Sequence, residues 1–219
     1  ACVRAEVQLW HGWARARRST RPRAAVRALD LLGRAEELFD SIHDPRGRCW
    51  AQLGQAQAYR CLGEYALMRR SLGAAEPLVT RLDDRQAERW LHDLSIPALR
   101  ADGRYDDAEA HLQSLRRMGL DGNDRRIRGR AAAHGAALRF DLGEPPGDVV
   151  ETAQTAEALL RQVDGGSYDA LRTAYRAHVG ALLRRGDGTD AAAVLDEAES
   201  AVRDAPADQA PFWILRARI

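Results

Sequence analysis

Histidine, cysteine and carboxylate side chains are the first candidates for catalysis or metal binding, and their spacing argues against both roles. No pair among the six histidines and three cysteines has the spacing of a zinc site or a metalloprotease helix. His134 and His178 could meet on neighbouring helices, but structural or exposed roles are favoured. We therefore expect no catalytic residue, no metal site and no cofactor. The residues concerned are His11, His43, His92, His111, His134, His178, Cys2, Cys49 and Cys61.

The cysteines and the paired aspartates have simpler explanations than nucleophile or acid–base pair. A cysteine nucleophile needs a nearby base and an activating environment. The sequence shows neither a base nor an activating environment beside Cys49 or Cys61, so each is expected to be a small buried core residue. Asp83-Asp84 and Asp106-Asp107 stand where helices are expected to begin, and aspartate at a helix start caps it. Capping is therefore favoured over acid–base catalysis.

Tryptophan and arginine offer a different chemistry, because aromatic faces and guanidinium groups dominate the strongest positions of protein interfaces. Three of the five tryptophans are spaced by 40 and 40 residues, and three glycines share this period. After the third glycine the period slips to 43, and the extra residues fit a loop at Gly165-Gly166. Two residue types with one period indicate a repeat along the whole chain. The repeating residues are Trp10, Trp50 and Trp90, and Gly63, Gly103, Gly143 and Gly186.

Helices must position these side chains, since each repeating glycine separates two segments of helical periodicity. Glycine closes a helix in the left-handed conformation. Each repeat is thus predicted to hold a helix of about 16 residues before the glycine and a second helix after it. The chain then contains ten helices and the start of an eleventh near 209–219, which would open a sixth repeat. Pro77 and Pro97 lie inside helical patterns and are expected to kink or end them.

The second helix of each repeat is predicted to bury one face, marked by apolar residues three and four positions apart. The fourth repeat departs from this pattern with Asp148, Thr152 and Thr155. Its second helix is therefore expected to be shifted in register or loosely packed. The buried faces expected in the other repeats are Ala28, Leu32 and Ala35; Met68, Leu72 and Ala75; Ala108, Leu112 and Leu115; and Ala191, Leu195 and Ala198.

Composition agrees with closely packed helices and limits the class of partner. Of the 219 residues, 40 are alanine, a small side chain and the strongest helix former. The formal net charge is only +1, which is weak support for a nucleic-acid binder. Arginine clusters at 15–23 and 125–130 are interpreted as solvated helix faces in preference to phosphate contacts. No apolar run reaches the roughly 18 residues of a membrane span, so we expect a cytoplasmic protein without a membrane partner.

The repeat resembles the tetratricopeptide repeat (TPR) superfamily. That signature is a small residue and an aromatic in the first helix, then the turn glycine, a second aromatic, and a small residue opening the second helix. The second repeat supplies Ala56, Tyr59, Gly63 and Tyr65, with Met68 where alanine is usual. The third repeat supplies Gly103, Tyr105 and Ala108, followed by Leu112 and Leu115.

The 40-residue period is longer than the usual 34 of this superfamily. It is similar to the longer variant in the regulatory regions of large bacterial transcription activators, signalling ATPases and caspase-like peptidases. The resemblance implies an all-α, right-handed α-solenoid of antiparallel helix pairs, with about five repeats plus a partial sixth, forming a single domain over 1–219. Solenoid ends are normally polar, and the apolar segment 212–215 is not, so we expect a piece of a longer protein.

In such a solenoid the first helix of each pair lines a concave face, where residues at offsets of three and four form one stripe. A stripe of tryptophan and arginine would suit an extended peptide or an acidic segment. The alternative, that the tryptophans pack between neighbouring first helices, is favoured. The carboxylate clamp of this family uses lysine and asparagine, and a chain without lysine does not carry that preference over. The predicted partner-binding groove comprises Trp10, Trp13, Arg17, Trp50, Gln57, Arg60, Trp90, Arg100, Arg130 and Arg176.

The sequence therefore predicts a non-enzymatic binding module. It would be the protein- or peptide-binding scaffold or sensor region of a larger bacterial intracellular regulatory protein, and it could form a homo-oligomer. Two alternatives stay open. The repeats could be the regulatory arm of an enzyme, a caspase-like peptidase or a signalling ATPase, whose catalytic domain lies outside this chain. They could also form an all-α regulator that binds a small molecule, with the tryptophan stripe as an apolar pocket.

Overall fold

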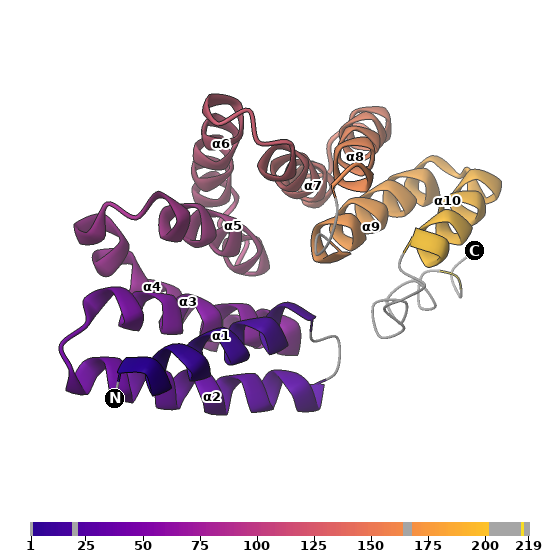
Figure 1. The fold of residues 1–219 in the computed structure, drawn as a ribbon. Helices are drawn as coiled ribbons and strands as arrows, with labels where there is room; N and C mark the ends of the chain where they lie inside the picture. Colours follow the sequence, from indigo (N-terminus) through magenta and orange to yellow (C-terminus); the bar gives the residue numbers. More distant parts are fainter. Residues whose placement is uncertain (1, 19–21, 164–167, 202–215, 217–219) are drawn as a thin grey trace. The chain divides into compact units, whose positions relative to one another are not determined.

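Ten α-helices make up the part of the chain that the computed structural model describes, which is residues 2–18, 22–163, 168–201 and 216 (Figure 1). The predicted eleventh helix near 209–219 and the loop at Gly165-Gly166 lie outside the described residues, apart from Arg216. The helices are α1 (Cys2–Arg18), α2 (Pro22–Ser41), α3 (Pro45–Leu62), α4 (Tyr65–Leu82), α5 (Arg85–Ala101), α6 (Tyr105–Asp121), α7 (Arg125–Asp141), α8 (Pro146–Arg161), α9 (Tyr168–Arg185) and α10 (Gly188–Ala201).

The 40-residue repeat is visible in the backbone where each helix pair ends and the next begins. Asp44, Asp84 and Asp124 precede α3, α5 and α7, and each side chain accepts hydrogen bonds from the backbone N–H groups two and three residues later. The residue before each aspartate has a positive φ, between 44° and 55°, although none is glycine. The glycines predicted to close the first helices have positive φ as well: Gly63, Gly103, Gly143 and Gly186.

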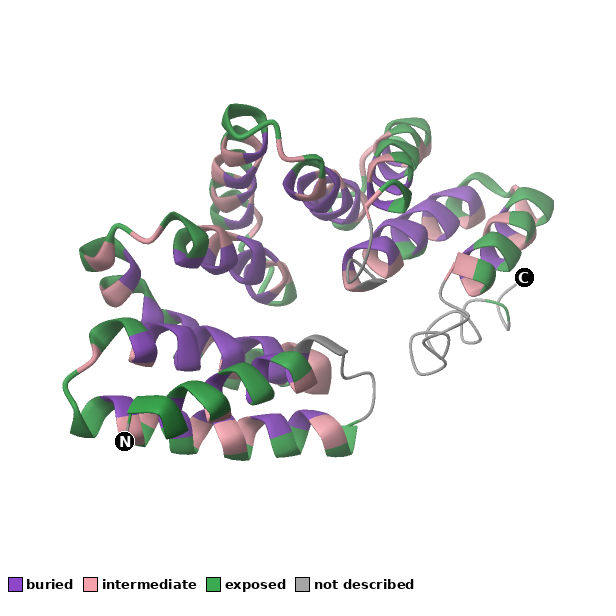
Figure 2. Cartoon of the chain, in the orientation of Figure 1, coloured by how far each residue is buried: buried purple, intermediate pink, exposed green. Residues whose placement is uncertain are grey.

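The chain forms two compact units, of which the first is Ala1–Asp102. Helices α1 to α5 pack in sequence, and the first helices of successive pairs also pack on one another, α1 on α3 and α3 on α5. Helix α3 is buried on several faces, whereas α2 and α4 each bury one stripe (Figure 2). Small residues permit this close approach, since a Cβ added to Gly47 would lie 2.2 Å from the Phe39 ring.

The second unit is Gly103–Ile219, and its helices α6 to α10 follow the same scheme, with α7 packed on α9. In the fourth repeat the second helix, α8, buries Val149, Ala153 and Ala156. These positions are each one residue later than the repeat pattern, so the predicted shift in register is confirmed. The shift turns polar side chains outward and keeps an apolar stripe against the neighbouring helices.

Pro77 and Pro97 were expected to kink or end their helices; they do not end them, and a kink at either proline stays a prediction. Helix α4 continues past Pro77 to Leu82, and α5 continues past Pro97 to Ala101. A proline inside a helix removes one backbone hydrogen bond and costs about 3 kcal/mol. The residues around each proline still bury an apolar stripe, as Val79 does beyond Pro77, so packing outweighs the local cost.

The protein is all-α, and its helices pack sequentially in adjacent pairs, as in a helical-repeat or solenoid-like arrangement. The buried faces predicted for the second helices of the other four repeats are confirmed. The expectation of one domain over 1–219 stays a prediction. Within the residues that the structure describes, no helix is long and apolar enough to span a membrane.

Candidate binding cavity

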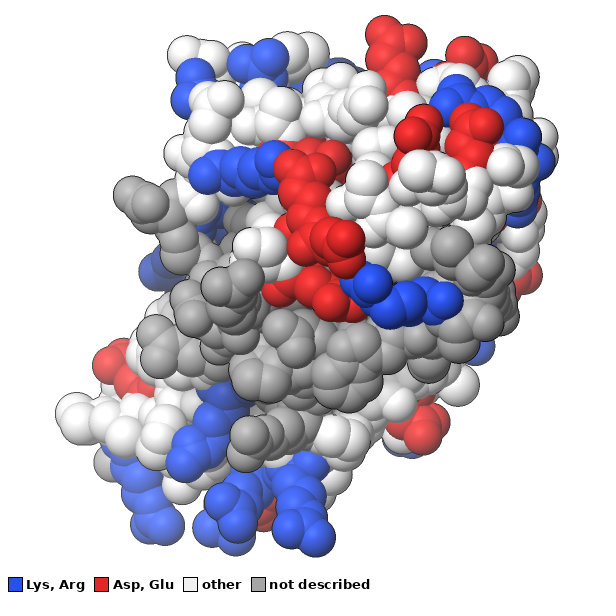
Figure 3. All heavy atoms as spheres, turned by 90° about the vertical axis from the view of Figure 1, so that its right-hand side faces the viewer, with Lys and Arg blue, Asp and Glu red and all other residues white. Residues whose placement is uncertain are grey.

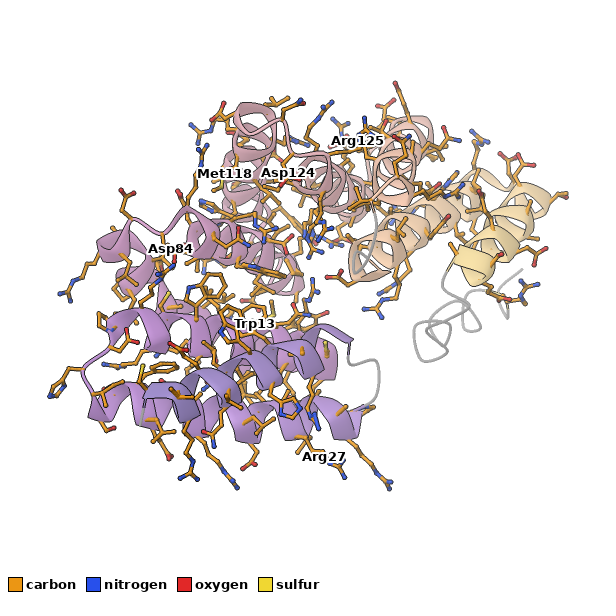
Figure 4. The ribbon with its side chains drawn as sticks, viewed as in Figure 1. Trp13, Arg27, Asp84, Met118, Asp124 and Arg125 are labelled. Carbon is orange, nitrogen blue, oxygen red and sulfur yellow. The ribbon has the colours of Figure 1, made fainter. Side chains whose placement is uncertain are left out.

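Three tryptophans from three successive first helices pack together in the first unit. Trp13 of α1 lies with its ring centroid 5.8 Å from that of Trp50 of α3 and 5.0 Å from that of Trp90 of α5 (Figure 4). All three rings are buried. The indole Nε1 of Trp13 donates a hydrogen bond to the backbone carbonyl of Trp50, 2.9 Å away. For these three residues the structure shows the packing role that the sequence favoured.

Asp84 fixes the position of the second tryptophan relative to the next helix. Its carboxylate caps α5 by accepting hydrogen bonds from the backbone N–H groups of Gln86 and Ala87, and it also accepts one from Trp50 Nε1 at 3.3 Å. Arg46 adds a contact of 3.2 Å. Partial burial raises the pKa of Asp84, but the hydrogen bonds from Ala87, Trp50 and Arg46 outweigh this effect, so the pKa lies below its ordinary value.

Trp10 lies at the same repeat position as Trp50 but is largely uncovered. Its side chain is 57% exposed, and its ring centroid is 6.1 Å from that of Trp50. Its indole N–H makes no hydrogen bond within the described part of the chain. The ring borders a cavity of about 570 Å³, a volume typical of ligand sites. The cavity is lined by Glu6, Leu9, Trp10, Trp13, Ala14, Phe39, Asp44, Arg46, Gly47, Trp50, Gln86 and Trp90.

The lining combines a broad aromatic surface with a few polar groups. Indole and phenyl rings can bury a large apolar or aromatic side chain. Around them, Glu6 and the 70% exposed side chain of Arg46 offer an acceptor and a donor for the polar groups of a partner. The free indole N–H of Trp10 adds a second donor. This arrangement is suited to recognition by burial and hydrogen bonding.

The structure brings four of the predicted groove residues together at this cavity, namely the four tryptophans. Gln57 is buried in α3, where its Nε2 lies 3.8 Å from Cys61 Sγ and its Oε1 has no partner among the described residues. Arg60 and Arg100 are half-buried and lie outside the cavity lining. Arg17 belongs to α1, but its side chain lies outside the described residues.

The two groove residues predicted in the second unit lie in different surroundings. Arg130 of α7 is buried and pairs with Asp169 in the first turn of α9, at 3.0 Å and 2.9 Å between nitrogen and oxygen. This two-pronged contact fastens one first helix to the next, as Trp50 and Asp84 do in the first unit. Arg176 is exposed on α9.

The structure confirms burial for Cys49 but not for Cys61, which is half-buried. Capping is confirmed for Asp84, whereas Asp106 and Asp107 lie inside the first turn of α6 and do not cap it. Cys49 is buried, and desolvation together with the nearby charge of Asp84 raises the pKa of its thiol to about 11. The thiolate, which is the nucleophilic form, is therefore strongly disfavoured near neutral pH. Asp84 caps a helix, whereas Asp83 closes the preceding one with a positive φ. Among the described residues, no group of three or more His, Cys, Asp or Glu side chains could hold a metal ion.

Comparison with known proteins gives no further identification. The chain matches no protein-family model and has no significant match among curated proteins.

Proposed function

We propose that the chain is a non-enzymatic protein-binding module of the TPR type, the scaffold or sensor region of a larger regulatory protein. In this proposal the helix pairs form a right-handed solenoid of about five repeats, and the first helices line its concave face. The packing of first helix on first helix and the 40-residue spacing of caps and turns support it. Small-angle scattering tests it, because a solenoid gives an elongated curved particle and a compact bundle would contradict it.

The exposed indole of Trp10 at the rim of the aromatic cavity is the observation that carries the proposed function. A tryptophan buries up to roughly 250 Å², so its 57% exposure leaves about 140 Å² uncovered. Covering that area would contribute about 3.5 kcal/mol at 25 cal/mol per Å². Tryptophan is enriched among the residues that contribute most to binding at protein interfaces. A partner segment in extended form would place one large apolar side chain in the cavity and accept a hydrogen bond from Trp10.

Trp10→Ala is the variant that tests this function, because an exposed ring contributes little to folding. Photo-crosslinking through a benzophenone amino acid placed at Glu6, followed by mass spectrometry, would identify a protein segment seated over the cavity. Capture should be lost in Trp10→Ala and retained in Val26→Ala, which removes a similarly exposed apolar side chain from α2 outside the cavity. Equal capture by both variants would contradict the proposal.

A small-molecule regulator is the second candidate function, and the cavity volume favours it specifically. About 570 Å³ falls within the range of drug-sized and cofactor-sized ligands. The two functions differ in the kind of molecule, a protein segment or a metabolite, whose binding is lost in Trp10→Ala. A metabolite that changes the intrinsic tryptophan fluorescence of the purified chain, and fails to do so in Trp10→Ala, would favour the second.

A further inference from the structure

A second cavity, independent of the proposed protein-binding function, lies in the second unit between two second helices. Helices α8 and α10 both pack on α9, but their backbones do not touch along their described lengths. The space between them measures about 460 Å³. One stripe of each helix lines it: Val150, Glu157 and Arg161 are at helical spacing on α8, and Leu182 and Val194 face it from α9 and α10.

A buried carboxylate and imidazole form the middle of this cavity. His178 of α9 and Glu157 of α8 have side chains that are 6% and 7% exposed, and His178 Nδ1 lies 3.0 Å from Glu157 Oε1. A carboxylate accepts hydrogen bonds, which favours the tautomer of His178 with the proton on Nδ1. The other ring nitrogen, Nε2, makes no hydrogen bond within the described part of the chain. In the neutral ring Nε2 is an acceptor.

The remaining charges of the cavity leave an excess of carboxylates. At one end Arg161 is already held by Glu197 and by the hydroxyl of Tyr175. At the other end Arg185 pairs with Asp187. Both guanidinium groups are thus compensated inside the protein.

Two carboxylates therefore remain for a ligand, those of Glu157 and Asp190. Asp190 makes no ion pair within the described part of the chain, and Glu157 has a second oxygen without a hydrogen bond. The side of the molecule where α10 lies in Figure 1 faces the viewer in Figure 3, and acidic side chains gather on it next to arginines.

We propose that this cavity binds a free aliphatic diamine. One ammonium group donates to Glu157 and to His178 Nε2, and the other pairs with Asp190. Asp190 lies in the first turn of α10, five residues after Arg185 at the end of α9, and Arg185 lies seven residues from His178, about 10 Å along that helix. Ammonium–carboxylate hydrogen bonds shorten that span at each end, which leaves room for a chain of four or five methylene groups. The methylene groups lie against Leu182 and Val194.

Titration of the full chain with 1,4-diaminobutane and 1,5-diaminopentane tests the site. Calorimetry should give a Kd below about 1 mM, and the ring resonances of His178 should shift in the histidine carbon–proton NMR spectrum. Butylamine, which has one ammonium group, should bind at least about tenfold more weakly because it cannot reach both carboxylates. Absence of heat and of a His178 shift, or equal binding of butylamine, would overturn the proposal.

Matched charge changes separate a built site from general attraction to the acidic surface. Glu157→Gln and Asp190→Asn should each weaken diamine binding about tenfold or more. Glu151→Gln removes the same charge from the exposed side of α8 outside the cavity and should leave the affinity unchanged. An equal loss in all three variants would show non-specific attraction and contradict the proposal. Melting curves by circular dichroism identify any variant that loses its fold, and the comparison of Asp190→Asn with Glu151→Gln then decides the test.

Discussion

Replacement of Asp84 by alanine is expected to destabilise the first unit more than the loss of an ordinary helix cap. Its carboxylate accepts hydrogen bonds from Gln86, Ala87 and the Trp50 indole, and it is nearly covered, with 11% of the side chain exposed. One substitution thus removes both the N-terminal cap of α5 and the hydrogen bond that links Trp50 of α3 to it. Asp84 therefore connects the first helices of two successive repeats.

The magnitude follows from the separate contacts. Loss of an N-cap costs about 1 kcal/mol, and leaving the largely buried Trp50 N–H without an acceptor costs about 1–3 kcal/mol. The ion pair with Arg46 contributes at most about 1 kcal/mol, because that arginine is 70% exposed. We expect Asp84→Ala to lower the free energy of unfolding by about 2–4 kcal/mol.

Asp44→Ala is the matched control, since Asp44 caps α3 with the same two backbone hydrogen bonds and bonds no tryptophan. It should cost only about 1 kcal/mol. Urea denaturation followed by tryptophan fluorescence measures both, because four of the five tryptophans lie in residues 1–102. If Asp84→Ala and Asp44→Ala unfold at the same urea concentration, the bond to Trp50 contributes nothing and the reasoning is refuted.

Three further predictions concern acid, helix contacts and thiol reactivity. Because the pKa of Asp84 is lowered in the folded state, its contribution to the free energy of unfolding is present above about pH 4 and is lost as the pH falls through the folded-state pKa. Denaturation curves should therefore show that Asp84→Asn loses less stability than the unsubstituted protein when the pH is lowered. Gly47→Ala should destabilise the protein by about 1–3 kcal/mol, because the added Cβ would overlap the Phe39 ring. Gly33→Ala, in open space within α2, should instead stabilise it by up to about 1 kcal/mol. Thermal melts that rank the two variants in the opposite order would contradict the packing. With a pKa of about 11, Cys49 should resist iodoacetamide at pH 8 until urea unfolds the chain, while the exposed Cys2 reacts at once, as peptide mass spectrometry would show.

The local features of the fold followed from the sequence because they depend on spacing within one helix or turn. Faces such as Met68, Leu72 and Ala75 repeat at three and four residues, and the left-handed turn at Gly63 needs a residue without a Cβ. The caps at Asp44, Asp84 and Asp124 share the same 40-residue period, and the sequence predicts the one at Asp84 from its place at a helix start.

Contacts between helices could not be predicted in the same way. The bond from Trp50 to Asp84 spans 34 residues and depends on how closely α3 and α5 approach. His178 was paired in the sequence with His134 as a candidate, whereas its hydrogen-bond partner is Glu157, because the one-residue shift of α8 brings that carboxylate to the buried side. Helix continuity through Pro77 was also a tertiary effect, decided by burial beyond the proline.

Trp10 differs in exposure from its equivalents in the repeat, and this difference supports the proposal that it contacts a partner. The repeat position is a packing position: Trp50 is buried and bonds the aspartate that begins the next first helix, and Arg130 does the same with Asp169. Trp10 has the same register but leaves its ring and its N–H uncovered at a cavity. Trp50 lies on a helix with a first helix on either side, α1 and α5, whereas α1 packs on one described first helix, α3, so the ring of Trp10 is open to a partner. Substitution of Trp10 should therefore change binding, whereas substitution of Trp50 should change folding.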